Sequence, residues 1–320
     1  MNSTTPRVSM DRDGKVSASG KRAPLGTVTR RRFYVSDAFA EYFPAHEFSY
    51  YRDFFGLPGE TLKQERRTHV VLVRRTVMDE ADKHACLFVV KCHRYPILPR
   101  LRTGFRISKA ENEFKSLLYL RSAGVPAVEP VAFGVERTAA GLVRSCFIVT
   151  RYLEAAVNLA DWQWHHAGLY ADRATRRAVH LRRLGAIFQR LHRARFFLFT
   201  AKTKNILLSP IADVDPEMHL IDTPYARTLH WLPLARWAQG RDLGYCLGSF
   251  YPAVTAEDLK SFYEGYLPDA LGDSDEQLQR RVLHAICVQQ NITPLARSVN
   301  TVKDYLRRRR RARRLRFAQR

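Results

Sequence analysis

Two short stretches decide how this chain folds: Lys202-Thr203-Lys204-Asn205-Ile206-Leu207-Leu208 and His219-Leu220-Ile221-Asp222. Each holds an apolar run typical of a β-strand, and the segment between them is rich in turn-forming residues. The pattern predicts a β-hairpin with Asn205 before the first strand and Asp222 after the second. Mg²⁺ takes oxygen ligands of this kind and usually shares its shell with substrate phosphates. The hairpin therefore predicts a magnesium site, unless Asn205 and Asp222 serve only as loop and turn caps.

A second hairpin is predicted closer to the N-terminus, because residues 68–77 and 86–91 are rich in β-branched or apolar side chains. Lys91 closes the second of these strands, where an ammonium group is costly unless it has a partner. The spacing of apolar residues predicts a helix over residues 109–123. Glu113 shares the inward face of that helix, and Glu111 is its rival as the partner of Lys91.

The remaining pattern divides the chain into a β-rich part and a helical part. Two more strands are predicted at 131–134 and 146–150, and helices are predicted at 175–192, 241–250, 255–266, 275–290 and 296–316. We expect an α+β fold, with a small, mostly antiparallel N-lobe that contains one helix and a larger α-helical C-lobe. The predicted divisions are a disordered basic arm (1–32), an N-terminal segment and N-lobe (33–152), a C-lobe (153–306) and an Arg-rich tail (307–320).

The charge of the chain is strongly positive, with 53 Lys and Arg against 31 Asp and Glu, a net charge of +22. Nine arginines lie in the tail at 307–320, which attracts polyanions unless it is only a solvated tail. Leu315 and Phe317 alternate with these arginines, which favours an anionic membrane surface. Because zinc-finger spacing and RNA-binding aromatic motifs are both missing, we do not expect nucleic acid as the main partner.

The order of these segments resembles the lipopolysaccharide kinase family, bacterial enzymes that phosphorylate Kdo or heptose in the inner core. The resemblance spans residues 65–250. The stretches that carry it are Arg67-Thr68, Phe88-Val89-Val90-Lys91-Cys92-His93-Arg94, Glu111-Asn112-Glu113-Phe114, Gly124-Val125-Pro126, Phe147-Ile148-Val149-Thr150, Leu191-His192-Arg193-Ala194, both stretches of the first hairpin, and Arg241-Asp242-Leu243. It implies a bilobal protein-kinase-like fold that uses ATP and Mg²⁺.

The resemblance also implies a role for each candidate residue. Lys91 would hold nucleotide phosphates beside Glu113, and Asn205 and Asp222 would bind Mg²⁺. The linker residues Thr150, Arg151 and Leu153 would offer backbone groups to adenine. Lys202 would neutralise the transferring phosphate or face solvent, Asp242 would support the catalytic loop, and His192 would be structural.

Two expected features are missing from the chain. No Gly-rich loop precedes Lys91, although a loop without glycine can still cover phosphates. Thr200 occupies the position of the catalytic Asp, and a threonine hydroxyl does not act as a base near neutral pH. Retention of the other groups beside Thr200 leaves two interpretations, a divergent kinase and a pseudokinase that binds nucleotide.

Three functional hypotheses follow. The first is an ATP-dependent sugar kinase that phosphorylates a Kdo or heptose hydroxyl on a lipid-linked anionic saccharide, in the cytoplasm at the surface of the inner membrane. The second is a pseudokinase that acts as a nucleotide-binding or scaffold module in envelope biogenesis. The third is a kinase-like protein that serves nucleic acid or another acceptor.

Overall fold

The computed structural model describes residues 30–44, 47–48, 51–78, 83–96, 100, 103, 107–163, 173–210, 216–250, 254–267 and 271–289. The predicted tail at 307–320, the predicted helix at 296–316 and the first 29 residues of the predicted arm lie outside these ranges. So do residues 211–215, in the predicted turn between Leu208 and His219.

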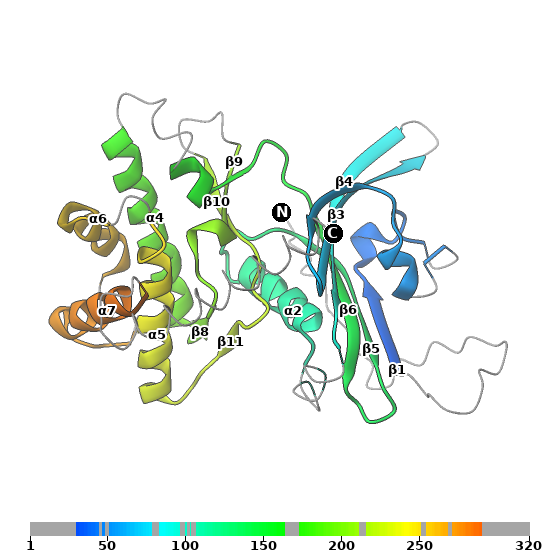
Figure 1. The fold of residues 1–320 in the computed structure, drawn as a ribbon. Coiled ribbons are helices and arrows are strands. Elements are labelled where there is room, and N and C mark those ends of the chain that lie inside the picture. Colours follow the sequence, from blue (N-terminus) through cyan, green and yellow to red (C-terminus); the bar gives the residue numbers. More distant parts are fainter. Residues whose placement is uncertain are drawn as a thin grey trace, which may run out of the picture.

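A six-stranded antiparallel sheet forms the first part of the molecule, drawn on the right of Figure 1, in the order β1-β5-β6-β4-β3-β2. Its strands are β1 (Arg30–Val35), β2 (Glu60–Gln64), β3 (Thr68–Met78), β4 (Lys83–Arg94), β5 (Pro130–Arg137) and β6 (Val143–Arg151). The register places Lys91 of β4 opposite Val70 of β3 and Ile148 of β6, so the lysine lies in the middle of the sheet.

Strand β1 corrects the predicted boundary of the basic arm, because it begins at Arg30 instead of after residue 32. It pairs with β5 along its whole length. Alternation explains how a basic segment joins the sheet: Phe33 packs 5.2 Å from Phe54 on one face, and Arg32 pairs with Glu111 at 3.0 Å on the other. The strand could not be predicted from apolar content, because its first three residues are arginines.

The two faces of the sheet are covered by different segments. Buried phenylalanines of the aromatic-rich segment cover one face, over Val90, Phe147 and Val149. These phenylalanines are Phe39, Phe43, Phe48 and Phe54. Helix α2 (Lys109–Ser122) covers the other face, where the alternate residues Cys146 and Ile148 belong to a second core.

Helix α2 has clear start and stop signals. Ser108 caps it by accepting a hydrogen bond from the backbone N–H of Glu111 at 3.1 Å. Gly124, with φ of +67°, follows the helix in the left-handed conformation that glycine adopts without strain. The observed bounds agree with the helix predicted at 109–123.

The second part of the chain is mostly helical, as predicted. Its helices are α3 (Leu159–Asp161), α4 (Arg173–Arg193), α5 (Leu232–Leu247), α6 (Ala256–Tyr266) and α7 (Asp275–Gln289). Helix α5 begins well before the predicted start at 241, with a proline in its first turn and large exposed apolar side chains that blur its periodicity. None of the described helices combines the length and apolar composition that a membrane-spanning helix needs.

Short strands shape the loops of this helical part. The predicted hairpin is present as β9 (Ile206–Ser209) and β10 (Glu217–Leu220), which pair in antiparallel fashion, and β7 (Val157–Asn158) adds to β9. A separate pair consists of β8 (Phe196–Phe197) and β11 (Arg227–Thr228). Together these strands hold the loop at 198–205 between α4 and α5.

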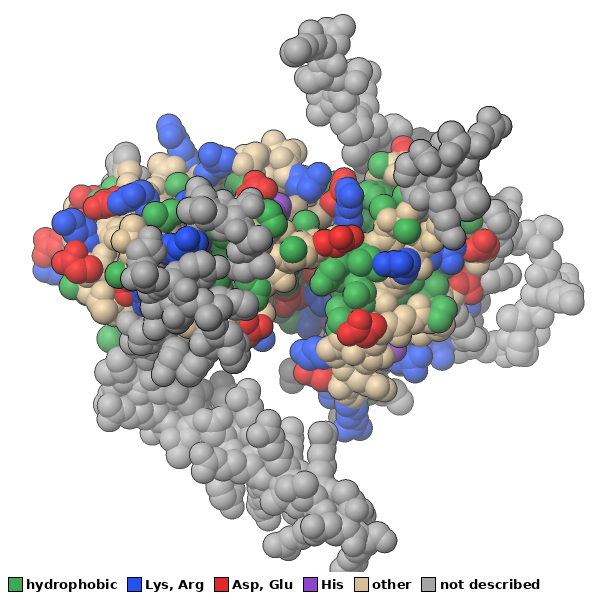
Figure 2. Space-filling view, turned by 90° about the horizontal axis from the view of Figure 1, so that it is seen from above, with side chains coloured by type: hydrophobic (Ala, Val, Ile, Leu, Met, Phe, Trp, Pro, Cys, Tyr) green, Lys and Arg blue, Asp and Glu red, His purple; other side chains and the backbone are tan. Residues whose placement is uncertain are grey.

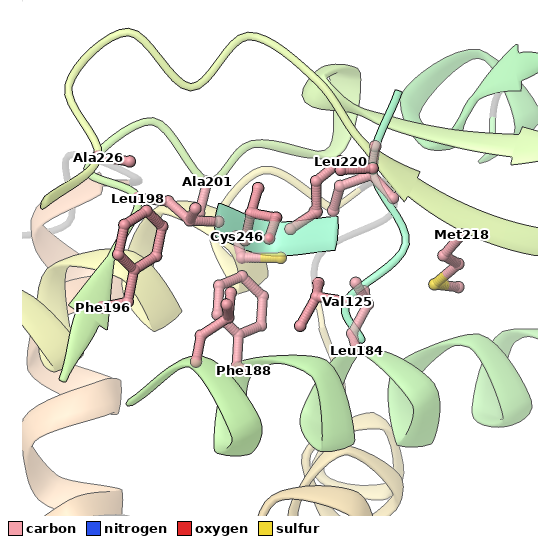
Figure 3. Packing of buried hydrophobic residues seen from close by; sticks show 14 of the residues in the cluster. Val125, Leu184, Phe188, Phe196, Leu198, Ala201, Met218, Leu220, Ala226 and Cys246 are labelled. Carbon is pink, nitrogen blue, oxygen red and sulfur yellow. The ribbon is translucent and has the colours of Figure 1, made fainter. Parts of the chain in front are cut away.

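One hydrophobic core spans both parts of the molecule. It joins Phe114 and Leu117 of α2 to Leu184 and Phe188 of α4. Figure 3 shows residues of this core beneath the loop that contains Leu198 and Ala201. Main-chain hydrogen bonds add to this contact, because Val128 donates to Leu220 at 3.2 Å and Leu220 donates to Pro126 at 3.0 Å. On the face shown in Figure 2, basic and acidic side chains are interspersed and do not gather in one patch.

Candidate active site

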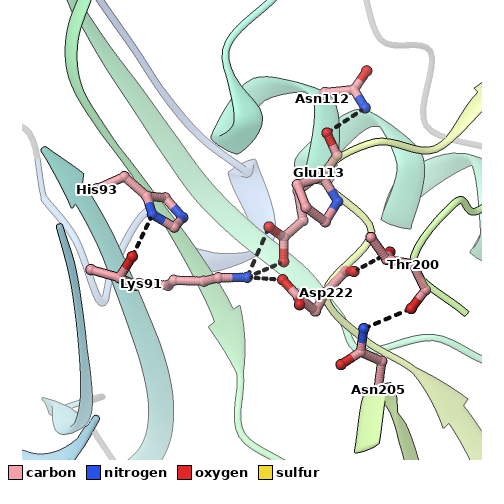
Figure 4. A network of polar contacts seen from close by, with 9 residues as sticks. Lys91, His93, Asn112, Glu113, Thr200, Asn205 and Asp222 are labelled. Atoms are coloured by element: carbon pink, nitrogen blue, oxygen red, sulfur yellow. Dashed lines mark hydrogen bonds and ion pairs between the residues drawn. The ribbon is translucent and has the colours of Figure 1, made fainter. Parts of the chain in front are cut away.

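A partly buried polar cluster joins the two parts of the molecule, and its centre is Lys91 (Figure 4). The Lys91 ammonium donates to both carboxylate oxygens of Glu113, at 2.9 and 3.0 Å, and to Oδ1 of Asp222 at 2.5 Å. Glu113 comes from α2, and Asp222 follows β10 in the helical part. The cluster thus brings together the lysine predicted to bind phosphate and one of the residues predicted to bind metal.

The geometry also decides between the two glutamates that compete for Lys91. Glu111 contacts Arg32 at 3.0 Å and Lys115 at 2.9 Å instead. Residues two apart on a helix point in very different directions, so Glu111 and Glu113 cannot both face Lys91. Glu113 is therefore the partner of Lys91 from this helix.

The charges of the cluster reinforce one another. Burial alone would lower the pKa of Lys91, but the carboxylates of Glu113 and Asp222 outweigh burial and raise it. Burial would raise the pKa of Asp222, yet the charge and hydrogen bond of Lys91 hold it below its ordinary value. At neutral pH the cluster therefore offers a permanent ammonium beside an ionised aspartate.

Asn112 fixes the segment that follows Asp222. Its side-chain amide donates to the carbonyls of Pro224 at 3.1 Å and Ala226 at 3.0 Å. Asn112 and Glu113 are neighbours on α2. The same helix therefore positions Lys91 through Glu113 and the chain after Asp222 through Asn112. No local sequence signal announced this role of Asn112, since the pairing joins residues more than a hundred positions apart.

Thr200 serves as a structural link within the site. Its hydroxyl donates to the main-chain carbonyl of Asp222 at 2.9 Å, and its own carbonyl accepts from the side-chain amide of Asn205 at 2.8 Å. In the sequence resemblance, Thr200 occupies the position of the catalytic base. Its side chain instead bonds the backbone of Asp222 to the loop. A hydroxyl engaged in this way offers no proton acceptor of useful basicity.

Asn205 and Asp222 fit a magnesium ion by their chemistry. The amide nitrogen of Asn205 is used by Thr200, which leaves its Oδ1 as the atom that could bind a cation. In the described part of the chain no group of three or more His, Cys, Asp or Glu side chains could hold a metal. An ion here would depend on these two oxygens together with phosphates and water, which is the usual arrangement for Mg²⁺.

The loop that carries Thr200 is held from below by Asp242 of α5. This fully buried carboxylate accepts hydrogen bonds from the backbone N–H groups of Leu198 and Phe199, both at 2.6 Å. His192, also fully buried, lies 3.6 Å from Asp242 and 2.8 Å from the hydroxyl of Tyr266. Both residues therefore support the loop and have no access to a ligand.

Two residues of the site hold a backbone conformation that is unusual for side chains with a Cβ. Phe199 has φ of +60° and Asp222 has φ of +55°. Such residues cost of order 1–3 kcal/mol each and persist where the surrounding structure fixes them. Here Asp242 binds the backbone N–H of Phe199, and the Thr200 hydroxyl binds the backbone carbonyl of Asp222, so the strained positions are those that orient the site.

The linker between the two parts begins after Thr150 and Arg151, the first two residues predicted for it. Thr150 and Arg151 belong to β6, and the backbone N–H groups of Arg151 and Tyr152 already donate to Glu129 and Leu87, both at 2.9 Å. Leu153 is the first predicted linker residue beyond this pairing. Backbone groups for an adenine ring would therefore come from Leu153 onward.

A tight turn between β2 and β3 occupies the place where kinase-like folds carry a phosphate-covering loop. Glu65 and Thr68 close it with mutual backbone hydrogen bonds of 2.8 and 3.3 Å, which leaves Arg66 and Arg67 exposed at its tip. The carbonyl of Arg67 accepts from the backbone of Arg94, three residues after Lys91. The tip of this turn thus carries two arginines and no glycine.

A hollow of about 530 Å³ lies elsewhere, between α6 and α7, with Leu259, Tyr263 and Leu283 in its lining. In Figure 1 these helices lie on the side of the helical part that is remote from the sheet. The hollow contains none of the polar cluster, so we assign the site from its polar contacts.

Comparison with known proteins agrees with this geometry. A family model described as "Lipopolysaccharide kinase (Kdo/WaaP) family" matches residues 62–266. A solved structure, "WaaP in complex with acyl carrier protein", is 20% identical with a TM-score of 0.56, and the match covers 81% of this chain and 99% of that one. At this identity the likeness shows the fold alone, and it confirms the predicted kinase-like fold.

A second solved structure, "Glucosamine kinase (crystal form A)", is 14% identical with a TM-score of 0.40 over 71% of this chain and 72% of that one. None of the curated proteins compared with the chain is a significant match.

Proposed function

Because the chain belongs to the lipopolysaccharide kinase (Kdo/WaaP) family, we propose that it is an ATP-dependent kinase of the lipopolysaccharide inner core. It would transfer the γ-phosphate of ATP to a Kdo or heptose hydroxyl of a lipid-linked saccharide. The observation that carries this proposal is the contact of Lys91 with both Glu113 and Asp222, with Asn205 joined to the same network through Thr200.

Each member of the network has a task in this proposal. Lys91, kept charged by two carboxylates, would hold phosphate oxygens of the nucleotide. Asp222 and Asn205 would hold Mg²⁺, which neutralises phosphate charge when it is bound. Glu113 would keep Lys91 in place while Asp222 turns to the metal. Phosphoryl transfer depends mainly on positioning and charge neutralisation, so these groups supply much of what the reaction needs.

The missing base is compatible with slow transfer. General base action contributes about 10²–10⁴-fold to such reactions. Asp242 cannot replace the base, because it is fully buried and bound to the loop backbone. The enzyme would therefore work through orientation of the acceptor hydroxyl and neutralisation of phosphate charge.

The proposed place of action is the cytoplasmic surface of the inner membrane, where ATP and the lipid-linked acceptor meet. The Arg-rich segment at 307–320 supports this placement by its charge and by the alternation of arginine with Leu315 and Phe317. The acceptor carries negative charge, which suits a chain of net charge +22.

Transfer of labelled γ-phosphate from Mg²⁺-ATP to purified lipid A–core acceptors tests the proposal, with Asp222→Ala as control. We expect transfer by the wild-type chain and a loss of at least a hundredfold in the variant. Unfolding curves of both proteins would show that the variant is folded. Absence of transfer to every core acceptor by folded wild-type protein would contradict the proposal.

The hydrogen bond from Thr200 to the carbonyl of Asp222 favours a second candidate, a pseudokinase that binds nucleotide without transfer. On this alternative the wild-type chain binds Mg²⁺-ATP but is inactive, and Thr200→Asp gains transfer because it restores a carboxylate at the base position. Thr200→Val is the matched control, since it removes the hydroxyl and adds no carboxylate. Equal activity of wild type and Thr200→Asp, well above that of Asp222→Ala, would exclude the pseudokinase.

A further inference from the structure

Helix α5 carries a stripe of alternating aromatic and basic side chains that ends at the loop of the site. Trp237, Arg241 and Tyr245 are spaced four residues apart and so share one side of the helix. The guanidinium of Arg241 lies 5.5 Å from the ring centre of Trp237 and 4.8 Å from that of Tyr245. The ammonium of Lys202 lies 5.4 Å from the same Tyr245 ring, so the stripe meets the loop there.

A second contact joins the other end of the stripe to the same loop. The ring of Phe199 lies 6.1 Å from Trp237, and the guanidinium of Arg227 stacks on Phe199 at 4.7 Å. Phe199 directly precedes Thr200. Figure 1 shows α5 running beside β8 and β11, the strands that border this loop. The stripe is therefore continuous with the site at both ends.

No ion pair with a carboxylate is found for Arg241 or Arg227 within the described ranges. Arg177, Arg182 and Arg236, by contrast, pair with Asp258, Glu264 and Asp273. The Nε atom of Arg241 is buried and makes no hydrogen bond to any described residue. A guanidinium held between two rings, with its N–H groups not used by carboxylates, is suited to a carboxylate or phosphate of a ligand.

The exposed side of the stripe also offers an apolar surface. Trp237 is 53% exposed, and Trp231, nearby at the start of α5, is 69% exposed. Between Thr223 and Leu247 the only acidic residue is Asp242, which is fully buried. The segment therefore combines exposed aromatic rings with positive charge, and its own carboxylate is buried.

We propose that Trp237, Arg241 and Tyr245, together with Lys202 and Arg227, form the surface that binds the acidic saccharide acceptor. Trp237 stacks on a sugar ring, and Arg241 with Lys202 pairs with a carboxylate or phosphate of the saccharide. This places the acceptor next to the loop that carries Thr200. The inference rests on the proposed function and names the part of the chain that recognises its substrate.

Binding measured without ATP tests this surface independently of transfer. The probe is the inner-core saccharide stripped of its acyl chains, titrated calorimetrically into the full chain. We expect Arg241→Gln and Trp237→Ala to weaken binding at least tenfold, with Arg241→Lys in between because it keeps the charge and loses the planar fork. Arg280→Gln, an equivalent charge change at an exposed position of α7, should leave binding within twofold of wild type.

The outcomes separate this inference from the proposed function. Wild-type binding that is unchanged in folded Arg241→Gln and Trp237→Ala overturns the surface, whether or not phosphate is transferred. Binding that is lost in these variants supports the surface even if the wild-type chain transfers no phosphate. If both variants lose binding to anionic lipid vesicles and keep saccharide binding, the face is a membrane contact and the inference is wrong.

Discussion

Lys91 has two acidic partners whose exposure differs sharply. The Glu113 side chain is 4% exposed, whereas that of Asp222 is 39% exposed. The exposed carboxylate can move to a metal ion at little cost, while the buried one stays where α2 places it. We therefore predict that Glu113 is a fixed support for Lys91 and that Asp222 is the partner that a ligand can replace.

Glu113→Gln tests this division of roles. Without the buried charge, Lys91 is left with Asp222 alone, and each draws the other away from nucleotide and metal. We expect the dissociation constant for Mg²⁺-ATP, measured by calorimetry, to rise about tenfold, which is about 1.4 kcal/mol. Glu111→Gln is the matched control, because the same change two residues earlier affects only Arg32 and Lys115. Equal effects of the two substitutions would contradict a specific role for Glu113.

At the scale of elements, we predict that the β2–β3 turn serves in place of a Gly-rich phosphate loop. A Gly-rich loop covers phosphates with backbone N–H groups, whereas this turn presents the side chains of Arg66 and Arg67. Its backbone is fixed by its own hydrogen bonds and by the contact of Arg67 with Arg94. The sequence showed only that glycines were missing, and the register of the sheet shows what occupies their place.

Substitution of the two arginines by glutamine measures the contribution of this turn. For Arg66→Gln and Arg67→Gln we expect the KM for ATP to rise roughly three- to tenfold in each case, with a smaller effect at high salt because exposed charges are screened. Lys63→Gln on the same hairpin is the control, since Lys63 pairs with Glu65 away from the tip. An equal rise in KM for Lys63→Gln would show that only the overall charge of the hairpin matters.

The elements that could be predicted are those whose apolar residues repeat with a regular period. The strands beside Lys91, helix α2 and the hairpin that precedes Asp222 all follow such patterns. Strand β1 was missed because its first residues are arginines, and the start of α5 was missed because its exposed apolar residues obscure the period. The contact between Lys91 and Asp222 joins positions 131 apart, so no local pattern predicts it.

At the scale of the whole molecule, the site depends on two parts that are held together below it. The shared core and the pairing of residues 126–128 with Leu220 fix α2 against the helical part. Lys91 and Asp222 therefore approach each other as parts of one folded unit. Conditions that loosen this unit should disturb the site, which makes the stability of the whole fold relevant to function.

Acid is one such condition, because His180 is buried in its neutral form. It is 3% exposed and packs edge-on against Trp162 at 4.7 Å. Burial, with the charges of Arg183 and Arg176, lowers its pKa to about 4. In the unfolded chain a histidine has a pKa of about 6.5. Between these two values the unfolded state binds a proton that the folded state does not, so the free energy of unfolding falls as pH falls.

His180→Phe should remove the contribution of His180 to this dependence and keep an aromatic ring in the core. We expect the free energy of unfolding of the variant to decline less steeply between pH 6.5 and 4, by up to about 1.4 kcal/mol per pH unit. Above pH 7 the two proteins should show the same slope. His284→Phe, at an exposed position of α7, should leave the slope unchanged. Parallel wild-type and His180→Phe curves from denaturant unfolding across this range would show that His180 is not a source of acid sensitivity.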